Sequence, residues 1–243
     1  MGPACPPSRD NITMPPNPKL SYFDASAETF PPAVIEELIR QEGRLLKHDP
    51  RRSIVKQVAF RGKSLIIKQP IDKDKRLWIR ILTLLRDSEA IRSLKSMTIL
   101  KQHGITTNTP LACLEYTWLG MTVSSYMIYE YIEGEAATQE DSQAILALIK
   151  QIHATGYLHG DTQMRNFLKH QGEILTIDCK LKPKLWGPIS ENLEYIRLGR
   201  RNETAQKYIN KSTASYKTAL ISHRLANLRG EVKNRIKNIL TLG

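Results

Sequence analysis

The stretch Tyr157-Leu-His-Gly-Asp-Thr-Gln-Met-Arg-Asn-Phe-Leu168 decides how we interpret this chain, together with Ile174-Leu-Thr-Ile-Asp178. Asp161 and Asn166 fall on a turn between a helix-like segment and a strand-like one. A short hairpin follows, and its second strand-like run ends in Asp178. The pattern therefore predicts two carboxylates and an amide at neighbouring points of a turn and a hairpin.

This combination of side chains favours one kind of chemistry. One carboxylate can receive a proton from a hydroxyl group, while an amide oxygen and a second carboxylate can hold a divalent metal. Phosphoryl transfer needs this set, because its catalysis is mostly positioning and charge neutralisation around a metal-bound nucleotide. A coincidental polar hairpin is the alternative, and the combined spacing of Asp161, Asn166 and Asp178 argues against it.

The spacing His-Gly-Asp-x4-Asn followed by Ile-Asp resembles the catalytic loop and metal-binding segment of the protein-kinase-like superfamily. The form His-Gly-Asp, in place of His-Arg-Asp, is similar to its small-molecule branches. The phrase from Ile149 to Asp178 most resembles the lipopolysaccharide kinase family, in particular the core heptose(II) kinases. Over residues 44–208 this resemblance implies an α+β, two-lobed fold. A small antiparallel-sheet N-lobe with a helix would precede a mostly helical C-lobe.

The resemblance also implies roles for individual residues, with ATP and Mg²⁺ as cofactors. Asp161 would orient the acceptor hydroxyl and receive its proton, and Asn166 and Asp178 would hold Mg²⁺. Together with Lys68, Asp161 and Asn166 form the predicted catalytic set. His159 is expected to shape the loop by hydrogen bonds. Arg165 either pairs with a phosphate of donor or acceptor, or makes a local structural contact.

Upstream, residues 43–47, 54–60 and 64–69 are strand-like and separated by turn chemistry, which predicts an antiparallel meander. Lys68 ends the apolar run of the third strand, where kinase-like folds place the lysine that neutralises nucleotide phosphates. A solvated strand-end lysine is the alternative. Glu89, which begins the second of two helices within 77–103, is its expected ion-pair partner.

Two alternatives to an ion pair between Lys68 and Glu89 remain open. Glu89 is equally suited to a first-turn glutamate that interacts with the helix dipole. Asp87 is the alternative partner of Lys68. Sequence spacing alone does not choose between them.

A second hairpin, over 111–119 and 123–130, leads into the expected hinge. The resemblance implies that the backbone of Glu130, Tyr131 and Ile132 binds the adenine. The lobe boundary is predicted beside it, with the N-lobe over 33–132 and the C-lobe over 133–243. An edge strand that simply turns is the alternative.

The chain departs from the protein-kinase pattern at two places. No Gly-x-Gly-x-x-Gly lies between the first two strands, and the turn there carries Arg51 and Arg52, which either supply positive charge or are simply solvated. Asp178 is followed by Cys-Lys in place of Phe-Gly. Both departures fit a constitutively active small-molecule kinase better than a regulated protein kinase.

The composition, with 41% hydrophobic and 25% charged residues over 243 positions, is that of an ordinary globular protein. No apolar run reaches the roughly 18–20 residues needed to span a bilayer, and no secretory signal pattern opens the chain. The three cysteines lie far apart in the sequence, which indicates free thiols in a reducing compartment. We therefore expect a cytoplasmic protein.

The net charge of +12 favours polyanionic partners: nucleic acid, an anionic membrane surface or a phosphorylated glycolipid. Much of it lies in two predicted helices, 190–208 and 213–240, and residues 181–187 lie where acceptor recognition is expected. No interleaving of aromatic and basic residues typical of RNA binding appears, so no nucleic-acid partner is expected. A lipopolysaccharide core acceptor and peripheral attachment to the cytoplasmic face of the anionic inner membrane are the predicted partners.

Residues 1–32, rich in proline, are predicted to be a disordered or loosely packed leader before the kinase-like domain at 33–243. The preferred function is an ATP-dependent kinase that phosphorylates a sugar hydroxyl, heptose by resemblance, of the lipopolysaccharide inner core. Two alternatives remain: a kinase of the same superfamily acting on another small molecule or a protein, and a non-catalytic kinase-like binding module.

Overall fold

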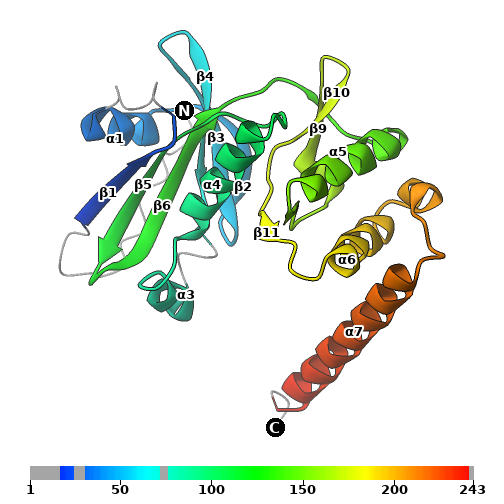
Figure 1. Cartoon of the computed structure of the whole chain (residues 1–243). Helices are drawn as coiled ribbons and strands as arrows, with labels where there is room; N and C mark the ends of the chain where they lie inside the picture. The colour runs from blue at the N-terminus through cyan, green and yellow to red at the C-terminus, as the bar shows by residue number, and fades with distance from the viewer. Residues whose placement is uncertain (1–16, 25–30, 72–75, 241–243) are drawn as a thin grey trace. The chain divides into compact units, whose positions relative to one another are not determined.

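The computed structural model describes residues 17–24, 31–71 and 76–240 (Figure 1). The chain divides into two compact units. The first unit comprises Met1–Ile91 and Leu111–Tyr129, and the second comprises Arg92–Pro110 and Glu130–Gly243. Among the described residues, no helix combines the length and the apolar character needed to cross a membrane.

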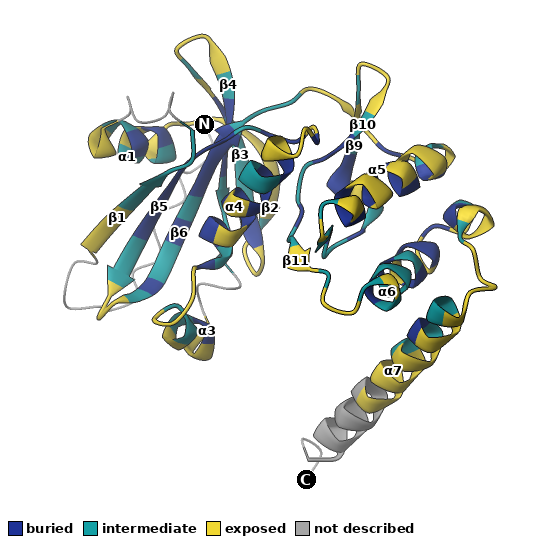
Figure 2. Cartoon of the chain, viewed as in Figure 1, coloured by how far each residue is buried: buried dark blue, intermediate teal, exposed yellow. Residues whose placement is uncertain are grey.

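The first unit is built on a six-stranded sheet with the order β1-β5-β6-β4-β3-β2 (Figure 1). The predicted meander is confirmed as β2, β3 and β4, whose neighbours pair antiparallel, and the second hairpin as β5 and β6. Figure 2 shows β5 as mainly buried, as expected for an interior strand. The strands are β1 (Asn17–Tyr22), β2 (Arg44–Asp49), β3 (Ser53–Phe60), β4 (Lys63–Gln69), β5 (Pro110–Trp118) and β6 (Met121–Glu130).

Helix α1 (Pro32–Arg40) covers one face of this sheet with Ile35 and Leu38, both fully buried. Their spacing of three places both side chains on one face of the helix. They pack against apolar side chains of β3, β4, β5 and β6. Helix α3 (Leu77–Leu82) and the start of α4 (Glu89–Gln102) complete the unit.

The predicted leader is wrong for part of its length. Residues 17–22 form β1, which pairs antiparallel with β5 along its whole length. The last two residues of β1, Ser21 and Tyr22, pair with Cys113 and Ala112 of β5. Proline is tolerated here because β1 lies at the edge of the sheet, where one side of the strand needs no hydrogen-bonded neighbour. Residues 1–16 and 25–30 of the leader lie outside the described residues.

The second unit has its own apolar core around α5 (Ser142–Ala154), which buries Ile145, Ile149 and Ile152 on one face. Phe167 from β9 and Leu198 from α6 join this core. The remaining elements are β7 (Glu135–Ala136), η2 (Gln139–Asp141), β8 (Tyr157–Leu158), η3 (Met164–Asn166), β9 (Phe167–His170), β10 (Glu173–Thr176), β11 (Lys182–Pro183), α6 (Pro188–Gly199), η4 (Thr204–Tyr208) and α7 (Ala214–Leu240).

Two boundaries differ from prediction. Residues 92–110 belong to the second unit, because Leu100 and Ile105 are buried in its core, so the lobe boundary is not a single point in the sequence. The predicted helix over 190–208 is two elements, α6 and η4. Buried Asn202 lies between them and accepts a hydrogen bond from the Ala205 N–H through its side-chain oxygen, which ends α6 and begins the next turn.

Candidate active site

The predicted loop runs from β8 through Gly160 and η3 into the β9–β10 hairpin, all within the second unit. The backbone N–H of Ile177 donates to the Asn166 carbonyl (3.0 Å), which holds the two ends of this hairpin side by side. Asp178 follows directly, so the structure brings the candidate metal ligands Asn166 and Asp178 to the same end of the hairpin.

His159 is fully buried and connects the loop to the hairpin. The Asp161 N–H donates to Nδ1 of His159 (3.3 Å), and Nε2 lies 2.8 Å from Thr176 Oγ1. The Thr176 hydroxyl in turn donates to the Asn166 carbonyl (3.3 Å). Because Nδ1 accepts, Nε2 must carry the proton, and the neutral imidazole is the form that this chain of hydrogen bonds needs. Burial lowers the pKa of His159, which stabilises that neutral form, although the Glu194, Asp161 and Asp178 carboxylates act in the opposite direction. The predicted structural role of His159 is therefore confirmed by its contacts.

Gly160 explains why the motif is His-Gly-Asp. Its φ of +83° lies in the left-handed region, and a Cβ built there would overlap the Lys180 carbonyl oxygen. The Lys180 N–H donates to the His159 carbonyl (2.9 Å), so the segment after Asp178 packs directly against the loop. A side chain at this position would separate them.

Glu194 on α6 anchors the loop, and the sequence analysis did not single it out. Its buried carboxylate accepts hydrogen bonds from the backbone N–H groups of His159 (2.9 Å) and Gly160, and from Nε2 of His153 (2.9 Å). Burial by itself raises the pKa of Glu194, but the hydrogen bond from His153, the nearby His159 and the Gly160 N–H lower it overall. Glu194 is therefore a charged residue that holds the loop in place.

A sequence signal for Glu194 does exist. It lies four residues after Ser190 and four before Leu198, and all three are buried. An acid on the buried stripe of a helix needs hydrogen-bond donors inside the protein, since buried charges are otherwise costly. That position distinguishes it from Glu191, which lies near the surface and pairs with Lys184 (2.7 Å).

Asp161 is oriented by its own loop. Nε2 of Gln163 donates to Asp161 Oδ1 (2.7 Å), and Nδ2 of Asn166 donates to the Asp161 carbonyl (2.8 Å). With its amide nitrogen engaged in this way, Asn166, which is only 5% exposed, has its amide oxygen as the group suited to a hard cation. The pair Asn166 and Asp178 therefore fits Mg²⁺ in its chemistry. Among the described residues no cluster of three His, Cys, Asp or Glu side chains is placed to hold a metal.

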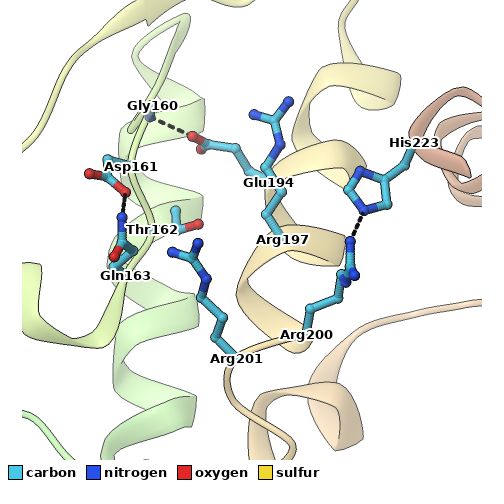
Figure 3. A pocket seen from close by; sticks show the side chains of 9 residues that line it. All are labelled: Gly160, Asp161, Thr162, Gln163, Glu194, Arg197, Arg200, Arg201 and His223. Atoms are coloured by element: carbon cyan, nitrogen blue, oxygen red, sulfur yellow. Dashed lines mark hydrogen bonds between the residues drawn. The ribbon is translucent and has the colours of Figure 1, made fainter. Parts of the chain in front are cut away.

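A cavity of about 510 Å³ opens beside Asp161, between the loop and α6 (Figure 3). In Figure 3 Arg201 extends from beyond the end of α6 toward Thr162 and Gln163, whereas Arg200 turns toward His223 on α7. A hydrogen bond joins Arg200 Nη1 to His223 Nε2 (2.9 Å). The lining residues are Gly160, Asp161, Thr162, Gln163, Glu194, Arg197, Arg200, Arg201 and His223.

Two further predicted site residues lie in the first unit. Lys68, half-buried near the end of β4, is paired in register with Val55 of β3. Glu89 is the first residue of α4 and is half-buried, whereas the alternative Asp87 is exposed. The hydroxyl of Ser88 accepts a hydrogen bond from the Ile91 N–H (3.3 Å), so α4 begins with a side-chain cap next to Glu89. The ion pair of Lys68 with Glu89 stays a prediction.

The predicted hinge follows β6, and its first residue is already engaged. The Glu130 N–H donates to the Thr109 carbonyl (2.9 Å), and the Glu130 carbonyl accepts from Nδ2 of Asn108 (2.9 Å). Backbone donors for an adenine would therefore come from Tyr131 and Ile132. Adenine binding by Glu130, Tyr131 and Ile132 also stays a prediction.

The other basic residues considered for the site differ in whether they contact the rest of the protein. Arg165 is exposed on η3, and the Arg51 N–H donates to Asp49 Oδ1 (3.1 Å) in an exposed turn. Lys184, in the segment assigned to acceptor recognition, donates to the His153 carbonyl (2.8 Å) as well as to Glu191. Lys184 therefore has a structural role, and acceptor recognition by that segment rests on its other residues.

Comparisons with known proteins bear on the fold. No family model matches the sequence, and a search of curated proteins finds no match. The solved structure "WaaP in complex with acyl carrier protein" is similar to this chain, with a TM-score of 0.51 and 13% sequence identity. The similarity covers 84% of this chain and 97% of that one.

A second solved structure, "The complex structure of Rv3197-erythromycin from Mycobacterium tuberculosis", has a TM-score of 0.38 and 18% identity over 65% of this chain and 50% of its own. Its similarity is too low to carry an argument. The match to WaaP agrees with the six-stranded sheet and the helical second unit described above. The chain therefore has an α+β, kinase-like fold similar to that of the WaaP structure.

Proposed function

We propose that this chain is an ATP-dependent kinase that phosphorylates a sugar hydroxyl of the lipopolysaccharide inner core, with heptose as the sugar. The observation that carries the proposal is that Asn166 is hydrogen-bonded both to Asp161 and to Ile177, the residue before Asp178. A kinase-like fold similar to that of WaaP supports it.

We assign the following roles to the individual residues of the loop and hairpin. Gln163 holds Oδ1 of Asp161, and we assign the other carboxylate oxygen, Oδ2, to the acceptor hydroxyl. There Asp161 accepts the proton as the hydroxyl oxygen forms its bond to the γ-phosphorus of ATP and ADP leaves. Asn166 and Asp178 would hold Mg²⁺, which when bound neutralises phosphate charge.

The remaining assignments concern the nucleotide. Lys68 would neutralise the phosphates of ATP and Glu89 would hold the lysine in position. The backbone of Tyr131 and Ile132, next to the engaged Glu130, would bind the adenine. These roles are carried over from the family resemblance, and the half-buried positions of Lys68 and Glu89 are compatible with them.

The proposal includes a place of action. The net charge of +12 would attract the chain to an anionic membrane surface and to a negatively charged glycolipid, at about 1 kcal/mol for each basic residue near the surface. Peripheral attachment on the cytoplasmic face of the inner membrane would then bring the acceptor to the loop around Asp161.

One assay tests the proposal: release of ADP from ATP in the presence of Mg²⁺ and purified lipopolysaccharide core acceptors. We expect acceptor-dependent turnover by the wild-type chain and a loss of about 10²–10⁴-fold in Asp161→Ala. Glu173→Ala, which removes an exposed acid from β10, is the matched control and should keep its activity. Lack of acceptor-dependent turnover in the wild-type chain would refute the glycolipid assignment, whereas turnover with another acceptor would indicate a different kinase.

A further inference from the structure

The cavity beside Asp161 carries an excess of positive charge that the proposed chemistry does not use. Three guanidinium groups, those of Arg197, Arg200 and Arg201, share its lining with two carboxylates. One of these carboxylates, Glu194, is already matched by hydrogen bonds from the loop backbone and from His153. The arginines therefore face the cavity with little opposing charge.

The arginines are held near the loop by the fold. Arg197 belongs to α6, and Arg200 and Arg201 follow its last residue, where buried Leu198 and Asn202 fix the backbone. All three arginine side chains are exposed, so a bound molecule can reach them.

His223 fixes one of the three guanidinium groups. Its Nε2 lies 2.9 Å from Arg200 Nη1 and 3.3 Å from Nδ2 of Asn227, and both neighbours are donors. Nε2 must therefore be the acceptor of a neutral imidazole. Burial, followed by the charges of Arg200 and Arg197, lowers the pKa of His223 and so agrees with that neutral form. The contact with His223 therefore holds Arg200 in position, and no carboxylate takes part in this contact to neutralise the guanidinium charge.

The position of the cavity separates it from the candidate metal site. Its lining includes Asp161 but neither Asn166 nor Asp178. A group bound by the arginines would therefore lie on the acceptor side of Asp161. Guanidinium groups recognise phosphate through paired hydrogen bonds, and a phosphate monoester offers three terminal oxygens and close to two negative charges near neutral pH.

We propose that Arg197, Arg200 and Arg201 bind a phosphate monoester already present on the acceptor, close to the hydroxyl that Asp161 activates. The identification of the bound molecule as the acceptor rests on the proposed function. The presence of an anion site at these arginines does not depend on it. It makes the substrate a phosphorylated sugar chain and gives these arginines a specific role in place of general attraction to a lipid surface.

The binding test uses inorganic phosphate as the probe. Phosphate is titrated into the full chain while the imidazole signals of His223, identified with His223→Asn, are followed by NMR. We expect a saturable shift in the wild-type chain that Arg201→Gln weakens about tenfold or more. Arg229→Gln, which removes the same charge from an exposed position on α7 outside the cavity lining, should bind as the wild type does.

The kinetic test compares one lipopolysaccharide core acceptor before and after phosphatase treatment. We expect the KM of the wild-type chain to rise about tenfold or more when the phosphate is removed, and Arg201→Gln to show that higher KM with both acceptors. Arg201→Lys keeps the charge but loses the planar fork, so its KM should be intermediate. Thermal unfolding of each variant checks that the fold is retained.

The outcomes separate the two proposals. Equal KM values for both acceptors, with Arg201→Gln and Arg229→Gln alike in both tests, would overturn the phosphate site and leave the kinase function intact. Saturable phosphate binding that depends on Arg201, without turnover of any core acceptor, would support the anion site and overturn the proposed function.

Discussion

Replacing Glu194 by alanine is the sharpest test of how the second unit holds the loop. The change removes the acceptor for three donors: the N–H groups of His159 and Gly160, and Nε2–H of His153. The Gly160 N–H borders the cavity, where water can replace the lost oxygen. The other two donors are buried, since His159 and His153 are 0% and 3% exposed.

The magnitude follows from these contacts. A buried donor left without an acceptor costs about 1–3 kcal/mol, and this change leaves two such donors. We therefore expect Glu194→Ala to lower the free energy of unfolding by about 3–5 kcal/mol. For a chain of this size the midpoint of thermal unfolding should fall by about 10 °C.

The assay is thermal unfolding followed by calorimetry, with Glu191→Ala as the matched control on the same helix. Glu191 pairs with Lys184 at side-chain exposures of 25% and 23%, so its loss should cost no more than about 1 kcal/mol. Equal changes in the two variants would show that the carboxylate of Glu194 does not anchor the loop.

The same carboxylate predicts a dependence on pH. The folded state lowers the pKa of Glu194 below its ordinary 4.5, so its contribution is complete above that value and is lost as pH falls through the folded-state pKa. The free energy of unfolding of the wild-type chain should therefore decline in that acidic range more steeply than that of Glu194→Gln. Parallel profiles for the two proteins would contradict this expectation.

Three further predictions concern the loop and the metal pair. Gly160→Ala combines a left-handed φ with a clash against the Lys180 carbonyl, so it should lower the midpoint of thermal unfolding more than Gly172→Ala. Gly172 has a similar φ of +84°, but a Cβ there meets no atom within 4 Å. Equal midpoints for the two variants would exclude the clash. Asp178→Asn should raise the Mg²⁺ concentration for half-maximal ADP release by about tenfold or more, and an unchanged Mg²⁺ titration would remove Asp178 from the metal site. Because burial lowers the pKa of His159 from 6.5, the unfolded state gains the proton first as pH falls below that value. Chemical denaturation should therefore show the free energy of unfolding of the wild-type chain falling with pH more steeply there than that of His159→Asn. Identical slopes of unfolding free energy against pH would argue against a neutral buried imidazole.

The sequence was most informative where structure is local. Strand-like runs and turn chemistry predicted β2, β3 and β4, and a helix-like segment was expected before the loop, where α5 lies. The motif from His159 to Asn166 predicted a turn between elements. Its polar residues favour a loop, and its glycine can adopt the positive φ that other residues avoid. The sequence by itself therefore determined the order of these elements and the position of the candidate catalytic loop.

Contacts between distant residues were decided only by the tertiary structure. Glu194 lies 34 residues after Gly160, yet it accepts the hydrogen bond of that loop N–H. Arg201 looked like one more basic residue of a C-terminal helix until the break after α6 placed it at the cavity beside Asp161. Residues 17–22 looked like part of a leader, and pairing with β5 made them a strand. Periodicity and turn chemistry report on neighbours within a few residues, whereas a buried carboxylate, a sheet edge and a cavity wall each acquire their partners only when distant segments pack together.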